Sequence, residues 1–131
     1  MKRPKWVSTQ LATAIHDEAI DEFGGASGLR DPGLLERALE RPRNLPAHEP
    51  ARSIFQLACT LCIGLAKNHP FADGNKRTAL LVTRVFLYLN GYAFEPREDE
   101  EVLTWVAIAD DSMSENELVA WLKQNCTRMR P

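Results

Sequence analysis

The 131-residue sequence has few cysteines, no secretory signal and no long apolar run, the features that mark disulfide-rich, secreted and membrane proteins. It has only three cysteines, an odd number, and its first ten residues are basic but lack the apolar core of a secretory signal. We therefore expect reduced thiols and a cytoplasmic protein. The longest strongly apolar run, residues 79–89, is interrupted by Thr83 and Arg84 and is too short to span a bilayer. No membrane partner is expected.

Neither sign of charge dominates the sequence. Sixteen Lys and Arg residues face eighteen Asp and Glu residues, which gives a formal net charge of −2. Such a field does not attract a polyanion, so nucleic acid is disfavoured as the main partner. Hydrophobic residues make up 44% and charged residues 26% of the chain, which excludes a disordered or fibrous protein. The length predicts one domain, residues 1–131.

Apolar residues recur mainly at helical spacing, and caps, glycines and prolines mark where the helices end. The pattern predicts helices over residues 11–23, 31–41, 54–67, 75–90, 98–109 and 114–122. The fourth is apolar almost all round, so it should lie at the centre of the fold. The residues expected to face the core are Leu11, Ile15, Ala19 and Phe23 in the first helix, and Val102, Trp105, Val106 and Ile108 in the fifth.

Little β structure is expected. Residues 41–50 contain three prolines, so this stretch forms either a loop or an edge hairpin, and a small β element is expected near residues 43–49. Residues 92–94 form at most a short extended piece between Gly91 and Pro96. The predicted fold class is all-α: a compact six-helix bundle around the fourth helix, with this small β-hairpin flap.

The residues that could take part in catalysis or ligand binding are concentrated at positions 69–77, between the third and fourth helices. Gly74 permits a tight turn, and the first N–H groups of the helix that follows have no internal partners, so a phosphate can bind there. Lys76 and Arg77 add positive charge to a helix start, where the helix dipole disfavours cations. A purely structural turn would not require them.

Three further residues complete this segment. Asp73 offers a hard oxygen ligand for Mg²⁺ shared with nucleotide phosphates, or it caps the helix. His69 offers an imidazole, the side chain best suited to take a proton from an attacking hydroxyl. Phe71 is interpreted as an apolar anchor that fixes the loop. Each residue alone has an ordinary structural explanation, but together they predict a site for phosphoryl or nucleotidyl transfer.

Other candidate residues are better explained by structure. Cys59 and Cys62 have metal-like spacing, but they lie in an apolar helix without a second ligand pair, so core packing is expected. His16 and His48 have no partners in sequence and are expected at the surface or in loops. Residues 128–130 form a short basic tail that we expect to be solvated.

Residues 69–80, HPFADGNKRTAL, resemble the signature of the Fic/Doc superfamily, and in detail that of the Doc (death-on-curing) toxins. Residues 28–42 and 87–92 also resemble that family, so the similarity covers about residues 8–125. The resemblance implies a six-helix Fic fold. It also implies a role for each site residue: catalytic base for His69, magnesium contact for Asp73, phosphate binding for Asn75, Lys76 and Arg77, and shaping of the anion loop for Gly74.

The resemblance further implies a bacterial toxin that is neutralised by an antitoxin supplied in trans. AMP-transferring Fic proteins have glycine where this chain has Lys76 and a second arginine where it has Leu80. Doc toxins share both departures, and they are kinases that use ATP to phosphorylate a threonine of elongation factor Tu. A built-in inhibitory helix is not expected, because the nearest match, residues 111–116, begins with aspartate instead of serine or threonine.

Three functions therefore stand at this point. The first is an ATP- and Mg²⁺-dependent protein kinase that acts as a toxin and halts protein synthesis. The second is transfer of AMP to a protein hydroxyl. The third is a non-catalytic module that binds an anion or an antitoxin without turnover, and the intact set of His69, Asp73 and Arg77 counts against it.

Overall fold

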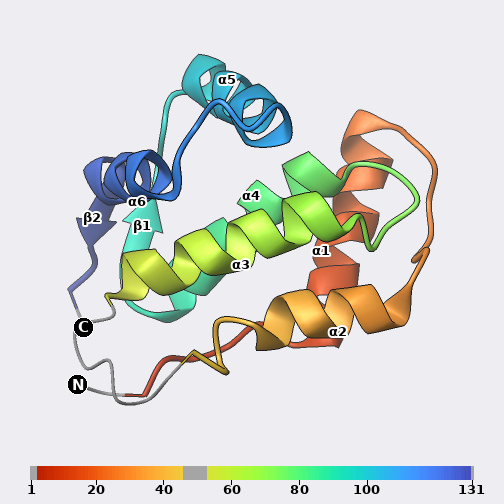
Figure 1. The fold of residues 1–131 in the computed structure, drawn as a ribbon, viewed down its shortest axis with the longest axis horizontal. Coiled ribbons are helices and arrows are strands. Elements are labelled where there is room, and N and C mark those ends of the chain that lie inside the picture. The colour runs from red at the N-terminus through yellow and green to blue at the C-terminus, as the bar shows by residue number, and fades with distance from the viewer. Residues whose placement is uncertain (1–2, 46–52, 131) are drawn as a thin grey trace.

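The computed structural model describes residues 3–45 and 53–130. Within these ranges the chain forms six helices and one two-stranded antiparallel sheet, which confirms the predicted class (Figure 1). The elements in chain order are α1 (Thr9–Phe23), α2 (Pro32–Glu40), α3 (Ile54–Asn68), α4 (Asn75–Leu89), β1 (Tyr92–Phe94), α5 (Glu98–Ala109), α6 (Glu115–Gln124) and β2 (Cys126–Arg128).

Capping residues explain where most of the helices begin. Asp31 accepts a hydrogen bond from a backbone N–H of the first turn of α2, and Pro32 occupies the first position of that helix. Ser114 and Glu117 form the predicted capping box at the start of α6. The start of α4 is different: its N-cap is Gly74, and no side chain makes a capping hydrogen bond there.

The centre of the molecule is the pair α3 and α4. Helix α4 contacts α1, α3, α5 and β1, as expected for the central helix, and α3 contacts α2, α5 and α6 on its other sides. Figure 1 shows α5 above this pair, α2 below it and α6 toward its left end. Cys59 and Cys62 are buried in the core with free thiols, which confirms the packing interpretation. Burial raises the pKa of Cys62 to about 11.

The buried face of α1 differs from the prediction. Ala12, His16 and Ala19 are buried, whereas Leu11 is 36% exposed and Phe23 is 53% exposed. Two of the three buried residues are alanines, which let α1 approach its neighbours closely. The expectation that His16 lies at the surface is wrong, because its side chain is completely buried.

Helix α5 is also buried less than predicted. Val102 is 49% exposed and Val106 is 55% exposed, so the expectation that both face the core is wrong. Thr104 and Ile108 are buried, and Trp105 is half-buried. The helix lies at the edge of the bundle and presents only a narrow face to it (Figure 1), and Val102 and Trp105 line a surface groove.

The small sheet forms at the end of the chain. β1 pairs with β2, with Tyr92 opposite Arg128 and Phe94 opposite Cys126. The extended piece at residues 92–94 is confirmed. Arg128 and Arg130 are exposed, as expected for a solvated basic tail, although Arg128 also pairs in the sheet and its guanidinium lies 5.9 Å from the centre of the Tyr92 ring. The two strands satisfy each other's backbone groups at an edge that would otherwise be open.

Two expectations concern a part of the chain that is only partly described. Residues 43 and 44 lie in a turn and residue 45 in a bend, and the rest of the β element expected near residues 43–49 lies outside the described residues, as does His48. Among the helices that the structure describes, none is long and apolar enough to cross a membrane.

Candidate active site

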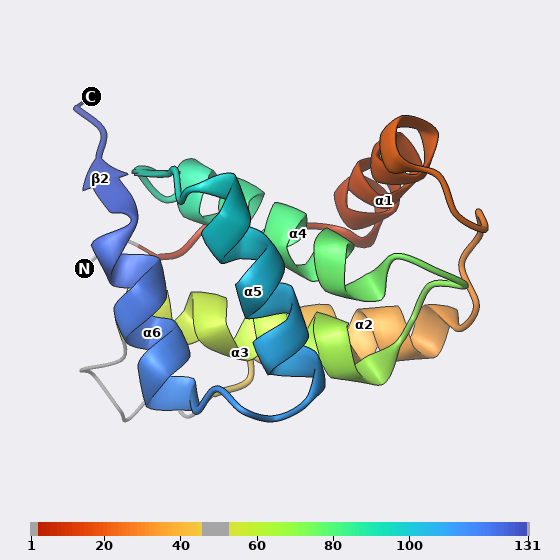
Figure 2. The same ribbon diagram turned by 90° about the horizontal axis from the view of Figure 1, so that it is seen from above.

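The loop between α3 and α4, residues 69–74, is held by the segment that connects α1 to α2. Pro70 accepts hydrogen bonds from the N–H groups of Arg30, at 2.8 Å, and Asp31, at 3.0 Å. Ala72 donates to the carbonyl of Gly28 at 3.0 Å. The two connections lie side by side in Figures 1 and 2. Backbone contacts therefore fix the loop from a segment about forty positions earlier in the sequence.

His69 stands at the entrance of this loop with an exposed side chain. It is the C-cap that directly follows α3, and its backbone is left-handed, with φ 50° and ψ 54°. The guanidinium of Arg30 donates two hydrogen bonds to the His69 carbonyl, at 2.8 and 2.6 Å, which stabilises this uncommon conformation. The imidazole is thereby presented to solvent on a fixed backbone.

Asp73 does not cap α4. One of its carboxylate oxygens accepts a hydrogen bond from Ala26 N–H at 3.2 Å, and the other from Gly74 N–H at 2.8 Å. The hydrogen bonds from Ala26 and Gly74 lower the pKa of Asp73 below its usual range, so the group is an anion at neutral pH. Each oxygen keeps a free lone pair, and the side chain is exposed.

The donor set fits a magnesium ion bound together with nucleotide phosphates. No group of three or more His, Cys, Asp or Glu residues that could hold a metal occurs in the described ranges. Magnesium keeps several waters and needs only one or two protein carboxylates when phosphates supply other ligands. One exposed, ionised Asp73 beside a helix start without a side-chain cap satisfies that requirement.

The side chain of Asn75 closes the loop on itself. Its Oδ1 accepts a hydrogen bond from Phe71 N–H at 2.9 Å, and its Nδ2 donates to the Phe71 carbonyl at 3.0 Å. The Phe71 ring is 2% exposed and lies in the core, as an anchor should. Because the amide of Asn75 is engaged in this way, a phosphate would meet this residue through its backbone N–H.

Lys76 and Arg77 stand in the first turn of α4. Lys76 is exposed, whereas Arg77 is half-buried with its guanidinium 4.3 Å from the centre of the Phe23 ring and 5.1 Å from that of Trp105. Its Nε is buried and has no hydrogen-bond partner among the described residues. Two aromatic rings from α1 and α5 thus fix the direction of the Arg77 side chain.

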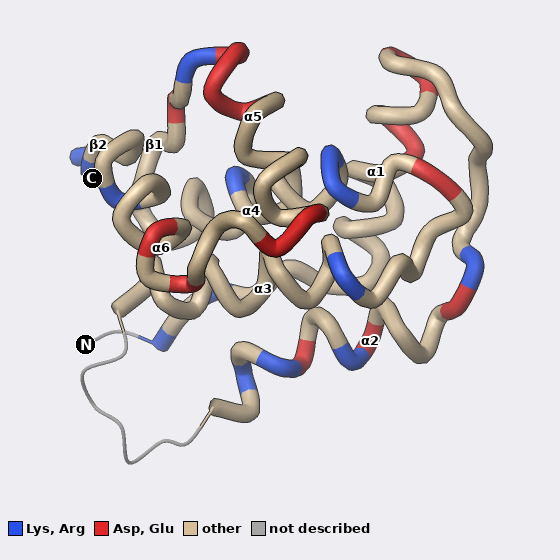
Figure 3. The backbone as a smooth tube through the Cα atoms, turned by 45° about the horizontal axis from the view of Figure 1, so that its top comes forward, with Lys and Arg blue, Asp and Glu red and all other residues tan. Residues whose placement is uncertain are grey.

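The charges at the start of α4 oppose the helix dipole. The first turn of α5 carries four acidic residues, the arrangement that a helix N-terminus favours, and Figure 3 shows this acidic turn. The first turn of α4 carries no acidic residue and contains Lys76 and Arg77. Stability does not account for that choice, whereas binding of an anion does.

The predicted site residues line one open cleft of about 850 Å³. Six of them contribute to its wall, and buried Phe71 supports the loop from below. Phe23 and Trp105 add apolar surface to the same cleft. The wall-lining predicted residues are His69, Asp73, Gly74, Asn75, Lys76 and Arg77.

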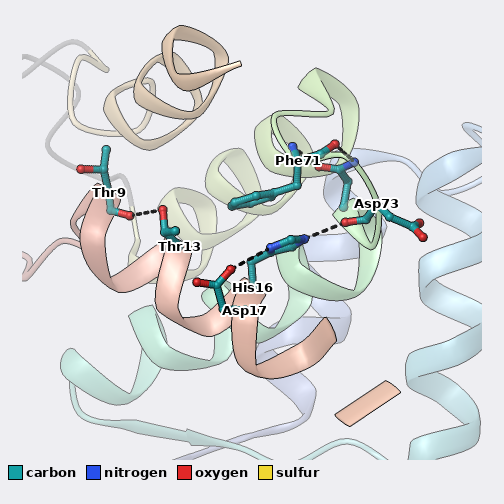
Figure 4. A network of polar contacts seen from close by, with 7 residues as sticks. Thr9, Thr13, His16, Asp17, Phe71 and Asp73 are labelled. Carbon is teal, nitrogen blue, oxygen red and sulfur yellow. Dashed lines mark hydrogen bonds and ion pairs between the residues drawn. The ribbon is translucent and has the colours of Figure 1, made fainter. Parts of the chain in front are cut away.

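Sequence reasoning missed two residues that hold the loop. His16 lies under it, with Nε2 2.8 Å from the Asp73 carbonyl oxygen (Figure 4). Its position four residues after Ala12 and three before Ala19 was the available signal, since this spacing places all three on one helix face. Arg30, the second, carried no periodic signal, because it precedes α2 in a loop.

Comparison with known proteins identifies the family of the chain. The family model described as the Fic/DOC family matches residues 6–87, which include α1 to most of α4 and the whole loop. The chain belongs to the Fic/Doc family. This Fic/Doc chain is 33% identical over 109 residues to the protein named Protein kinase doc of Escherichia phage P1, across 82% of this chain and 86% of the relative. It is 36% identical over 93 residues to Toxin Doc of Mycolicibacterium smegmatis, across 67% of this chain and 72% of that relative.

Proposed function

We propose that this protein is a Doc-type toxin, a protein kinase that uses ATP and Mg²⁺ to phosphorylate a hydroxyl side chain of elongation factor Tu and thereby halts protein synthesis. The observation that carries the proposal is the placement of the exposed His69 and the basic, uncapped start of α4 in one cleft. The names of the two relatives, a protein kinase and a toxin, support both parts of the proposal.

In the proposed reaction, His69 accepts the proton of the attacking hydroxyl. The hydroxyl oxygen bonds to the γ-phosphorus while the bond from that phosphorus to the bridging β–γ oxygen breaks, and ADP leaves with the electron pair. Lys76, Arg77 and the free N–H groups of α4 hold the phosphate oxygens. Asp73 would hold a magnesium ion, which would supply neutralisation of phosphate charge.

Two residues favour transfer of the γ-phosphate over transfer of AMP. The Lys76 side chain occupies space that a glycine would leave open to the phosphate chain, and it adds a charge of its own. Leu80 is 2% exposed and belongs to the core, so its position offers no group to clamp a second phosphate. Both features support a nucleotide placed with its γ-phosphate toward the hydroxyl.

The deciding experiment is intact-mass spectrometry of elongation factor Tu after incubation with the protein, ATP and MgCl₂. We expect the mass of one phosphoryl group to be added, and no addition with His69→Ala, because loss of a general base lowers a rate by roughly 10²- to 10⁴-fold. Addition of AMP would establish the second function instead. No addition by a folded wild-type protein would contradict catalysis on this target.

Lys76 provides a sharper comparison within the same assay. Lys76→Gly should lower γ-phosphoryl transfer by about tenfold to 150-fold, the effect of one charge-assisted contact worth roughly 1.5–3 kcal/mol. Lys76→Arg keeps the charge and should retain more activity. A companion change of Leu80 to Arg is not a useful test, because it would place a charge inside the core.

The proposed antitoxin would bind an apolar groove next to the cleft. This groove, of about 830 Å³, runs between α4, β1 and α5 and shares Phe23, Arg77 and Trp105 with the phosphate site. Tyr88 is 62% exposed on its wall, and Val102 is 49% exposed there. An apolar segment of an antitoxin lying in the groove would cover these residues and contact Arg77.

Growth experiments test this partner. Expression of the chain alone should arrest bacterial growth, and co-expression of the antitoxin should restore it. Val102→Asp should prevent rescue while leaving transfer intact, whereas the adjacent Leu103→Asp, which is 68% exposed but does not line the groove, should be rescued normally. Equal rescue of both variants would place the antitoxin elsewhere.

Glu115, in the segment nearest to a built-in inhibitory motif, lines a hollow between α3 and α6 instead of the cleft.

A further inference from the structure

His16 is a completely buried polar residue that touches the candidate active-site loop. Its imidazole lies parallel to the Phe71 ring, with ring centres 3.9 Å apart and planes inclined by 5°. Nε2 is 2.8 Å from the backbone carbonyl oxygen of Asp73. Figure 4 shows the ring between α1 and the loop, aimed at that carbonyl. His16 thus joins α1 to the loop by one apolar contact, with Phe71, and one polar contact, with Asp73.

The partners of the ring determine which nitrogen carries hydrogen. A carbonyl oxygen can only accept, so Nε2 must donate. Nδ1 has no hydrogen-bond partner among the described residues, and its distance of 3.6 Å from an Asp17 carboxylate oxygen is too long for a hydrogen bond. The directed contact of the ring is therefore the one to the loop.

The carbonyl that His16 holds belongs to the peptide unit between Asp73 and Gly74. The N–H of the same unit donates to the Asp73 carboxylate at 2.8 Å. Gly74, with φ +73°, is the N-cap from which α4 begins. A rotation of this unit would displace the Asp73 carboxylate and the first N–H groups of α4 together. His16 holds one end of the unit, and Asp73 holds the other.

We propose that His16 is a positioning residue for the phosphate site. Its Nε2–H fixes the peptide unit between Asp73 and Gly74 and so keeps the carboxylate and the start of α4 in the arrangement that binds nucleotide phosphates. The inference rests on the proposed function for its consequence in catalysis, but the restraint on the loop can be measured without any substrate.

A matched pair of substitutions separates this role from ordinary core packing. His16→Gln and His16→Met have side chains of similar length, and both lose the aromatic stack, but only glutamine can donate a hydrogen bond to the carbonyl. A packing role predicts that methionine is the better replacement, because it buries no polar group. A positioning role predicts that methionine folds at least as well yet functions worse.

The test follows backbone amide resonances of the labelled wild type and both variants by NMR during titration with ATP and MgCl₂. We expect hydrogen exchange at Gly74 to be about tenfold faster in His16→Met than in His16→Gln, and ATP affinity to be about tenfold weaker, as for one lost hydrogen bond. In the transfer assay, the loss should appear mainly in KM. Equal exchange and equal affinity in the two variants would overturn the proposal.

A measurement on the wild type keeps the proposal falsifiable if a variant does not fold. The ¹⁵N shifts of the His16 ring should show a hydrogen on Nε2 and none on Nδ1, and the opposite tautomer would overturn the proposal. If the Gly74 amide of the wild type is protected from hydrogen exchange but no resonance shifts on addition of ATP, the proposed function is contradicted, whereas the restraint of the loop by His16 stands. The two failures are therefore distinguishable.

Discussion

The backbone of His69 leads to a prediction in which two inactive variants differ in stability. The left-handed conformation of this residue, with φ 50°, costs an L-amino acid about 1–2 kcal/mol because of its Cβ. Arg30 stabilises the strained backbone by donating to the His69 carbonyl. A glycine at this position would not have the strain, whereas an alanine would keep it.

The expected magnitude follows from these two terms. His69→Gly recovers the Cβ cost of about 1–2 kcal/mol and loses roughly 0.5–1 kcal/mol to the greater entropy of unfolded glycine. The glycine variant should therefore be more stable than the alanine variant by on the order of 1 kcal/mol. For a chain of 131 residues, this corresponds to a difference of about 3–5 °C in Tm. Both variants should lack transferase activity, since neither has an imidazole.

Urea unfolding followed by circular dichroism measures this difference. The neighbouring Asn68, the last residue of α3, supplies a matched control, because alanine there should be more stable than glycine by up to about 1 kcal/mol. The order of glycine and alanine should thus reverse between positions 68 and 69. If alanine is as stable as glycine at position 69, the strained backbone and the argument built on it are wrong.

Two further predictions concern Asp73. Gly25→Ala would place a Cβ 2.8 Å from an Asp73 carboxylate oxygen, whereas the Cβ of Gly24→Ala would meet nothing within 4 Å. Both glycines have positive φ, so both variants should have similar backbone strain. We expect calorimetry to show a loss of Mg²⁺-dependent ATP binding only in Gly25→Ala. Hydrogen bonds from Ala26 and Gly74 lower the pKa of Asp73 in the folded protein. The carboxylate therefore contributes its full stabilisation of the fold above the pKa of the unfolded chain, about 3.9, and this stabilisation is lost as the pH falls through the lower pKa of the folded protein. Urea unfolding at several pH values should then show the wild type more stable than Asp73→Asn at neutral pH and the two converging in acid.

Elements with periodic or capping signals were predictable from the sequence. All six helices occur near their expected positions, because Asp31 with Pro32 and Ser114 with Glu117 specify ends locally. The chemistry-bearing residues also come together as expected, because they are adjacent in the chain and a single turn with Gly74 brings them into one cleft. Short-range spacing was sufficient for both.

Features that depend on distant contacts were not predictable in the same way. The depth at which α5 packs decides whether Val102 is covered, and the pairing of β2 with β1 depends on where the chain end lies. The support of the loop by Arg30 and His16 arises from contacts across 39 and 57 positions. Nothing in the local pattern around either residue points to the loop that it holds.

Different groups hold the loop and face the bound phosphate, and this separation determines which positions can be substituted with little loss of stability. The frame of the loop depends on main-chain carbonyls of His69, Pro70 and Asp73, which accept hydrogen bonds whatever side chain these positions carry. Lys76 is exposed and takes no part in that frame, so its replacement alters the phosphate environment without moving the loop. Leu80 lies in the core, and any larger or charged side chain there would require α4 to repack. A change of reaction at this site is therefore structurally simple at position 76 and costly at position 80.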